Sequence, residues 1–173
     1  PVSVATDYSG NFICKACGVG FERTKDSAPV TATQKCTVIQ CTGQESACGC
    51  PANKKVTFSS NKGTCSECAV GYVSEKDSVP VSATRQCTLA ACDGTTASCG
   101  CLSPNNEITE NGGNLTCTPC AGGYERATDS IPATAAKKCT LKICDGTNSL
   151  CGCKQGEAVE NALGRKFPPN LVC

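Results

Sequence analysis

Cysteine is the residue type whose chemistry matters most in this sequence. The chain has 173 residues, of which 19 are cysteine and none is histidine. Clustered cysteines can bind zinc, exchange disulfides in a redox reaction or form structural disulfides. Zinc sites usually combine two C-x-x-C pairs or add histidine, and a redox C-x-x-C needs a helix N-terminus in a βαβ context. Each C-x-x-C here has a C-G-C rather than a second C-x-x-C near it in the sequence, there is no histidine, and the context is not βαβ, so we favour structural disulfides and expect no metal.

Other residues that could carry out catalysis are equally sparse. Without histidine there is no ordinary serine or cysteine triad, and the acidic residues show no paired placement for a general acid and base. There is no phosphate-binding loop, and the D-G-T turns at 93 and 145 offer too few oxygen ligands for calcium. We therefore expect the protein not to be an enzyme and to have no cofactor.

The cysteines recur in three identical sets of six. Each set reads C-x-x-C, eighteen residues, C, four residues, C, six residues and C-G-C. The sets begin at Cys14, Cys65 and Cys117, 51 and 52 residues apart, which indicates a tandem repeat array. We assign residues 1–50, 51–101 and 102–153 as the first, second and third repeats, and residues 154–173 as a partial repeat or spacer.

Non-cysteine motifs recur with the same period. Each repeat contains a glycine–aromatic pair and a D-S-x-P tetrapeptide, which begins at Asp26, Asp77 and Asp129. The segments CTVIQC, CTLAAC and CTLKIC predict short strands. Large apolar residues are too few for an ordinary core, so disulfides must supply much of the stability. The sequence predicts a small disulfide-rich, mostly β and irregular fold, arranged as an elongated tandem array.

Six cysteines in a repeat allow fifteen disulfide connectivities, and the sequence alone selects none of them. Neighbours in C-x-x-C or C-G-C seldom bridge each other, because so small a ring is strained. We favour sequential pairing, in which one bridge of each repeat crosses to the next. It joins Cys17–Cys36, Cys41–Cys48, Cys50–Cys65, Cys68–Cys87, Cys92–Cys99, Cys101–Cys117, Cys120–Cys139, Cys144–Cys151 and Cys153–Cys173. Within C-G-C, the glycine is expected to give the backbone freedom to aim adjacent sulfurs in different directions.

Sequential pairing leaves Cys14 over. An odd number of cysteines requires a free thiol, an interchain bridge or a pair whose other half lies outside the sequence. Cys14 is therefore a candidate for covalent joining of one chain to another.

Composition also indicates the compartment. So many cysteines are typical of an oxidising environment, so we expect the protein to be extracellular or at the cell surface. The net charge is +1 with no basic stripe, and no apolar run is long enough to span a membrane. Nucleic acid is not an expected partner, and no membrane span is expected in this chain.

Glycans are a further prediction. Asn114 opens the only N-x-S/T sequon, N-L-T. The segments around the D-S-x-P tetrapeptides are rich in serine, threonine and proline, which is typical of O-glycosylated segments, although plain polar loops have the same composition. Candidate positions are Ser27, Thr31, Ser78, Ser82, Ser130 and Thr134.

The stretch CPANKKVTFSSNKGTCSECAVGY carries a family resemblance. With the repeat pattern, it resembles the cysteine-rich tandem repeats of ciliate surface proteins, the immobilisation antigens. That resemblance implies an abundant extracellular coat protein, usually lipid-anchored and without enzymatic activity. The stretch is also similar to the cysteine-rich domains of tumour necrosis factor receptors, which share its C-P, C-x-x-C and following glycine–tyrosine. The eighteen-residue gap and the C-G-C depart from the receptor pattern.

Two functions follow from these observations. The first is an extracellular structural protein, a disulfide-stapled glycosylated rod in a cell-surface coat or filament, with other copies of itself as partners, end to end or side by side. The second is a receptor or adhesin ectodomain that binds a protein ligand. A binding role predicts that one loop differs from the others in charge or aromatic content. The three D-S-x-P loops are alike, so we prefer the structural role.

Overall fold

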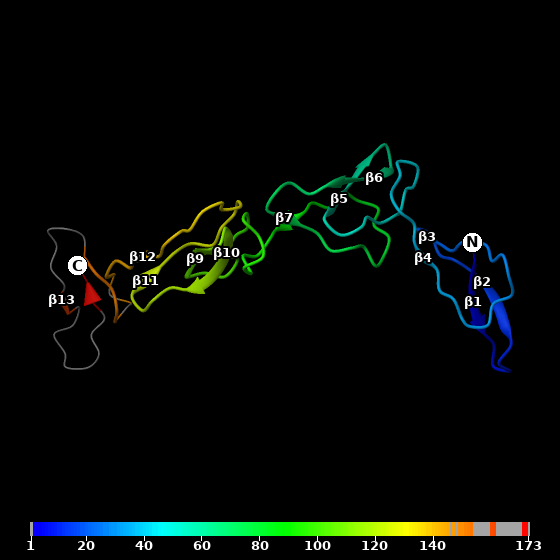
Figure 1. The fold of residues 1–173 in the computed structure, drawn as a ribbon, viewed down its shortest axis with the longest axis horizontal. Coiled ribbons are helices and arrows are strands. Elements are labelled where there is room, and N and C mark those ends of the chain that lie inside the picture. The colour runs from blue at the N-terminus through cyan, green and yellow to red at the C-terminus, as the bar shows by residue number, and fades with distance from the viewer. Residues whose placement is uncertain (1, 146, 148, 154–159, 162–170, 173) are drawn as a thin grey trace. The chain divides into compact units, whose positions relative to one another are not determined.

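The protein folds into short strands held together by disulfides, as the sequence predicts. The computed structural model describes residues 2–145, 147, 149–153, 160–161 and 171–172 (Figure 1). Within these residues it contains antiparallel strand pairs and no helix. The chain divides into two compact units, Pro1–Thr88 and Leu89–Cys173. The fold is thus small, disulfide-rich, mostly β and irregular, with a tandem arrangement.

Three longer hairpins lie between each C-G-C and the following C-x-x-C, or ahead of the first C-x-x-C, in segments for which the sequence analysis predicts no strands. They consist of β1 (Val2–Thr6) with β2 (Phe12–Ala16), β5 (Lys54–Ser59) with β6 (Lys62–Glu67), and β9 (Asn106–Asn111) with β10 (Asn114–Pro119). Two of these hairpins have a two-residue turn. Ser60 and Asn61 adopt φ of 49° and 60°, and Gly112 and Gly113 adopt 60° and 82°. Positive φ at both central residues is the type I′ geometry that matches the twist of a hairpin.

Shorter strand pairs contain the predicted strands after the D-S-x-P loops. They are β3 (Phe21–Glu22) with β4 (Thr37–Val38), β7 (Tyr72–Val73) with β8 (Thr88–Leu89), and β11 (Tyr124–Glu125) with β12 (Thr140–Leu141). A further short pair, β13 (Glu160–Asn161) with β14 (Leu171–Val172), follows the third C-G-C. In the first and third repeats, the glycine–aromatic pair begins such a strand: Phe21 pairs with Val38, and Tyr124 pairs with Leu141. The pairs β3–β4, β7–β8 and β11–β12 each join the two ends of a D-S-x-P loop.

The cores are small and rich in half-cystines. One cluster contains Cys41, Cys48, Cys50 and Val56, with Phe58, Cys65 and Val81 packed against it. The other contains Ala90, Cys92, Cys99, Cys101, Ile108, Leu115 and Ala133, with Cys117 against it. Each cluster combines cysteines from the end of one repeat with the hairpin and loop of the next. The compact packing therefore extends across the assigned boundaries at residues 50 and 101.

Candidate functional site

The candidate site lies where the last cysteines of one repeat contact the hairpin and the D-S-x-P loop of the next repeat. We call this contact region the joint. We call residues 41–50, 92–101 and 144–153, each reading C-x6-C-G-C, the C-G-C segments. Each closes on itself through a disulfide between cysteines seven residues apart: Cys41–Cys48, Cys92–Cys99 and Cys144–Cys151. The residue before each segment forms a parallel bridge with the glycine of C-G-C, as Ala91 does with Gly100. The segment is thus a rigid, stapled turn.

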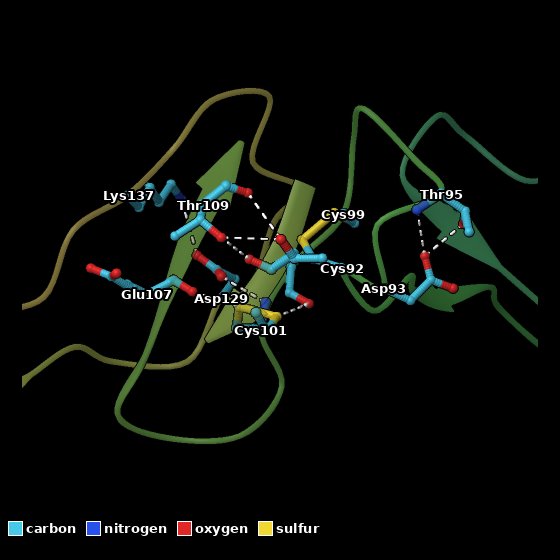
Figure 2. The surroundings of a disulfide bond; sticks show 12 residues. Cys92, Asp93, Thr95, Cys99, Cys101, Glu107, Thr109, Asp129 and Lys137 are labelled. Carbon is cyan, nitrogen blue, oxygen red and sulfur yellow. Dashed lines mark hydrogen bonds and ion pairs between the residues drawn. A yellow bond between two sulfur atoms is a disulfide. The ribbon is translucent and has the colours of Figure 1, made fainter. Parts of the chain in front are cut away.

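A carboxylate stabilises the turn inside each segment. Asp93 Oδ1 accepts hydrogen bonds from the backbone N–H of Thr95 at 3.0 Å and from its hydroxyl at 2.6 Å (Figure 2), and these bonds hold the pKa of Asp93 below its usual value. Asp145 and Thr147 repeat this pattern. In the first C-G-C segment Glu45 accepts bonds from the N–H and hydroxyl of Thr42, which lower the pKa of Glu45 to about 2. The turn is therefore stabilised in every copy, by two different kinds of carboxylate.

The C-G-C segment adds its backbone to the outer strand of the next hairpin. Gly43 donates to Gly63 O at 2.7 Å, and Gly63 donates to Glu45 O at 2.8 Å. In the next copy of the joint, Gly94 donates to Leu115 O at 2.9 Å and Leu115 donates to Thr96 O at 2.8 Å. The outer edges of β6 and β10 are therefore paired with a C-G-C segment, which is β-strand addition within one chain.

The same segment also pairs with the D-S-x-P loop. Cys48 and Val81 exchange two backbone hydrogen bonds of 3.1 and 2.8 Å, and Cys99 and Ala133 exchange two of 3.2 and 2.7 Å. The C-G-C segment is consequently held between the outer strand of the hairpin on one side and the loop on the other.

The aspartate of D-S-x-P anchors the end of the segment. Asp77 Oδ2 accepts the N–H of Cys50 at 2.7 Å, and Asp129 Oδ2 accepts the N–H of Cys101 at 2.9 Å (Figure 2). Both aspartate side chains are almost fully buried, with 2% of Asp77 and 4% of Asp129 exposed. A buried carboxylate needs compensating partners. Asp77 finds one in Arg85, with which it forms an ion pair at 2.6 Å.

The third repeat supplies two cations to this carboxylate. Arg126 and Lys137 lie 2.8 and 3.0 Å from the oxygens of Asp129. The hydrogen bond from Arg126, with those from Cys101 and Lys137, holds the pKa of Asp129 well below its usual range. In the sequence, this aspartate stands out only as the first residue of a recurring tetrapeptide. Its recurrence in all three repeats was the available signal for a larger role.

The glycine of C-G-C is required for space rather than for backbone freedom, which corrects the sequence interpretation. Neither Gly49 nor Gly100 has a positive φ. A Cβ atom on Gly49 would lie 2.6 Å from Cβ of Asp77 and 2.7 Å from Cγ1 of Val38. A Cβ on Gly100 would lie 2.9 Å from Cβ of Asp129 and collide with Leu89. Only glycine lets the anchoring aspartate approach the segment this closely.

Eight disulfides lie within the described residues, and each joins a pair of the sequential scheme. They are Cys17–Cys36, Cys41–Cys48, Cys50–Cys65, Cys68–Cys87, Cys92–Cys99, Cys101–Cys117, Cys120–Cys139 and Cys144–Cys151. Cys153 is disulfide-bonded, but the predicted partner Cys173 lies outside the described residues. Cys14 is a free, exposed thiol. Cys50–Cys65 and Cys101–Cys117 are the bridges that lock each C-G-C segment to the next hairpin.

The candidate glycosylation sites are accessible. Asn114 is exposed where β10 begins, directly after the Gly112–Gly113 turn. The six candidate O-glycosylation positions, Ser27, Thr31, Ser78, Ser82, Ser130 and Thr134, are also exposed. Occupancy of these sites by glycans stays a prediction.

The described residues offer few alternatives to a structural site. Two sets of three sulfurs lie within 4.8 Å of one another, Cys41, Cys50 and Cys65 in one and Cys92, Cys101 and Cys117 in the other. All six are in disulfides and so provide no thiolate for a metal.

A cleft of about 760 Å³ in the first unit is lined by Phe21, Val38, Pro51 and Asp77, among others. No helix long and apolar enough to cross a membrane occurs in the part of the chain that the structure describes.

Comparison with known proteins gives no further assignment. No protein-family model, no curated protein and no solved structure matches the chain. The heavy disulfide bonding indicates a secreted or extracellular protein. The joint fixes the end of one repeat to the beginning of the next by hydrogen bonds, an aspartate anchor and a disulfide.

Proposed function

We propose that the protein is an extracellular structural protein, a disulfide-stapled and glycosylated repeat array that forms part of a cell-surface coat or filament. The observation that carries this proposal is the joint. In both fully described copies, the sulfur-rich core of the joint is shared between one repeat and the next, and a disulfide crosses the assigned boundary. A shared core and a disulfide at each repeat boundary help a repeat chain to resist proteolysis and mechanical load.

The exposed loops are consistent with a coat. The D-S-x-P loops present serine and threonine at matching positions in successive repeats, and Asn114 stands exposed on the third hairpin. Glycans on such loops would cover the array at regular intervals and shield its backbone from proteases. A structural role also agrees with the similarity of the three repeats, since no loop is specialised by charge or aromatic content.

One observation favours the alternative of a receptor or adhesin ectodomain. The cleft in the first unit has an apolar floor of Phe21, Val38 and Pro51, and such concave apolar sites are typical ligand sites. Its carboxylate, Asp77, is already engaged by Arg85 and by the backbone of Cys50. The cleft is therefore left without a free carboxylate to select a ligand, and we rank binding second.

Native material distinguishes the two functions. Free thiols would be alkylated during extraction, and the extract studied by electron microscopy and by mass measurement with and without reduction and deglycosylation. A structural protein is expected in a regular layer or fibre with excess mass that deglycosylation removes. Unglycosylated material in a stoichiometric complex with a different protein would contradict the proposal and support the ectodomain.

A further inference from the structure

The only N-x-S/T sequon of the chain lies inside a joint. Asn114, Leu115 and Thr116 are the first residues of β10, and the outer edge of this strand is paired with the C-G-C segment of residues 92–101. Asn114 is exposed, Leu115 is buried and Thr116 is half-buried. The sequon is therefore partly at the surface and partly covered by the joint.

The asparagine itself has room for a glycan. Asn114 pairs with Asn111 at the end of the hairpin, and Gly112 and Gly113 form the turn between them. A Cβ atom on either glycine would have no atom within 4 Å beyond those of the adjacent residues. The space around the turn is thus open, and the folded hairpin can carry a glycan on Asn114.

The middle residue of the sequon is fixed in the joint. Leu115 is 1% exposed and lies in one cluster with Cys92 and Cys99. Its N–H donates to the backbone O of Thr96 at 2.8 Å, and its own O accepts the N–H of Gly94 at 2.9 Å. Removing Leu115 from this position requires the C-G-C segment to separate from β10.

The hydroxyl residue of the sequon is held in the same region. The Thr116 hydroxyl shares a hydrogen bond of 3.0 Å with the hydroxyl of Thr109, which is labelled in Figure 2. The next residue, Cys117, donates its N–H to Cys92 O at 3.0 Å and is bonded to Cys101. The disulfide thus lies directly after the sequon and locks it against the C-G-C segment.

Attachment of an N-glycan needs access to more than the asparagine. Because the acceptor sequence requires serine or threonine two residues after asparagine, the transferase must contact that hydroxyl as well. In the closed joint the Thr116 hydroxyl is already bonded and Leu115 is buried. The folded sequon is therefore a poor substrate, although its asparagine is exposed.

We propose that Asn114 is glycosylated before the Cys101–Cys117 disulfide forms, and that closure of the joint ends its reactivity. This inference rests on the proposed function, a glycosylated structural protein, and names the state of the chain that receives the glycan. Cys101 precedes the sequon and Cys117 follows it directly. Bridge formation and glycan transfer consequently compete on each new chain, and their relative rates set the fraction of chains with a glycan at Asn114.

The substrate of the transfer is a lipid-linked oligosaccharide. Nδ2 of Asn114 attacks its anomeric carbon, a C–N bond forms, and the bond from that carbon to the pyrophosphate oxygen breaks. The lipid pyrophosphate leaves with the electron pair, and the nitrogen loses one proton to solvent. The competing step is thiol–disulfide exchange, in which Cys101 and Cys117 lose two protons and two electrons to an oxidoreductase disulfide, which becomes a dithiol.

The test presents the full chain, made without glycans, to a purified oligosaccharyltransferase and its lipid-linked donor. One sample is folded and oxidised, and the other is reduced and alkylated. Mass spectrometry of the peptide that contains Asn114 measures the rate of glycosylation. The reduced chain should be modified at least about tenfold faster, because the folded chain must first open the joint. Equal rates would overturn the inference, and so would the absence of a glycan from both samples.

An added sequon in the first hairpin is the matched control. Asp7→Asn together with Ser9→Thr creates N-Y-T at residues 7–9, between β1 and β2, where Tyr8 is fully exposed. This sequon should be glycosylated at similar rates in the oxidised and the reduced chain. If oxidation slows it as much as it slows Asn114, the joint is not what blocks the enzyme, and the inference is wrong.

Translation into secretory microsomes, behind a signal sequence, tests the competition itself. Cys101→Ser removes the bridge and leaves the sequon intact, so the fraction of chains with a glycan at Asn114 should rise at least about twofold. Cys17→Ser removes a bridge of the first repeat and should leave that fraction unchanged. A fraction that Cys101→Ser does not raise, or that Cys17→Ser raises equally, would overturn the inference.

Failure of this inference is distinguishable from failure of the proposed function. If native material is a coat or fibre with a glycan at Asn114, but the oxidised chain is modified as fast as the reduced one, only the order of events is wrong. If native material is an unglycosylated soluble complex with another protein, the proposed function itself is wrong.

Discussion

At the scale of single residues, Asp129 is held by several partners at once. It is almost fully buried, accepts the N–H of Cys101 and faces two cations, Arg126 and Lys137. Such a carboxylate cannot lose its charge without leaving several donors and cations uncompensated. The ionisation of Asp129 is therefore linked to the binding of the C-G-C segment by the D-S-x-P loop.

The first prediction concerns pH. Because folding lowers the pKa of Asp129, its ionised form stabilises the joint above the pKa of an unfolded aspartate, about 3.9, and this stabilisation is lost as the pH falls from there through the folded pKa. Hydrogen exchange of the Cys101 amide, corrected for intrinsic rates, should accelerate below about pH 4. Asp129→Asn should remove about 2 kcal/mol of protection at pH 7 and flatten the pH dependence.

Asp93→Asn is the matched control, because the carboxylate of Asp93 accepts its hydrogen bonds from Thr95 in an exposed turn and not from Cys101. It should leave the exchange of the Cys101 amide close to that of the unmodified protein. Equal protection in Asp129→Asn and the unmodified chain at pH 7 would show that the anchor does not stabilise the joint.

The second prediction concerns the glycine of C-G-C. Gly100→Ala would place a methyl group against Leu89 and 2.9 Å from Cβ of Asp129, so it should destabilise the second unit by about 1–3 kcal/mol. The measurement is the midpoint of urea unfolding with all disulfides intact. Gly18→Ala is the control, since its Cβ would meet only Phe21 at an ordinary 3.8 Å. A Gly100→Ala variant as stable as Gly18→Ala would contradict the role of close approach.

At the scale of elements, the C-G-C segment and the hairpin depend on each other. A two-stranded hairpin alone is marginal in water, and β9–β10 buries chiefly Ile108 and Leu115 on its inner face. The C-G-C segment supplies the rest of the core through its half-cystines Cys92, Cys99 and Cys101. The hairpin and the C-G-C segment are therefore expected to fold together as one unit.

The third prediction compares the two disulfides of the joint. Cys101–Cys117 closes a loop of 16 residues and Cys92–Cys99 a loop of 7. Replacing the first pair by alanine should cost about 3 kcal/mol, and the second about 2 kcal/mol, in the chain-entropy description. Denaturant unfolding of the two double variants measures the difference. A smaller loss of unfolding free energy on removal of Cys101–Cys117 than on removal of Cys92–Cys99 would contradict this prediction.

Sequence patterns predicted some of these elements and missed others. Ring strain disfavours bridges between neighbouring cysteines, and the repeat spacing then favours the pairing of Cys50 with Cys65 without requiring it. The longer hairpins were missed, since a strand such as β5 needs only Val56 as its buried aliphatic residue when cysteines of another segment cover it. Apolar alternation is then too weak to recognise. The anchoring by Asp129 requires knowledge of which segments meet, which spacing alone does not provide.

At the scale of the whole molecule, sulfur takes the place of a hydrocarbon core. In the part of the chain that the structure describes, the fully buried residues are chiefly half-cystines, with Val56, Ile108 and Leu115 as the large aliphatic members. The free energy of unfolding should therefore depend on redox conditions far more than in a protein with an ordinary core.

The fourth prediction follows from this composition. Reduction and alkylation under native conditions should remove amide protection from all three longer hairpins together, as measured by hydrogen exchange with mass spectrometry. Among the described cysteines, the intact protein treated with alkylating reagent alone should react at Cys14 and nowhere else, and it should keep its protection. Persistent protection of β9–β10 after complete reduction would show that hydrocarbon packing suffices.

The order of the disulfides has a consequence for biosynthesis. From Cys17 onward, every described bridge joins a cysteine to the next one still unpaired along the chain. A chain that enters an oxidising compartment amino end first thus presents each thiol to its native partner before any later competitor arrives. The correct bridges can form in order of emergence, with little need for an isomerase to reshuffle them, however many repeats follow one another.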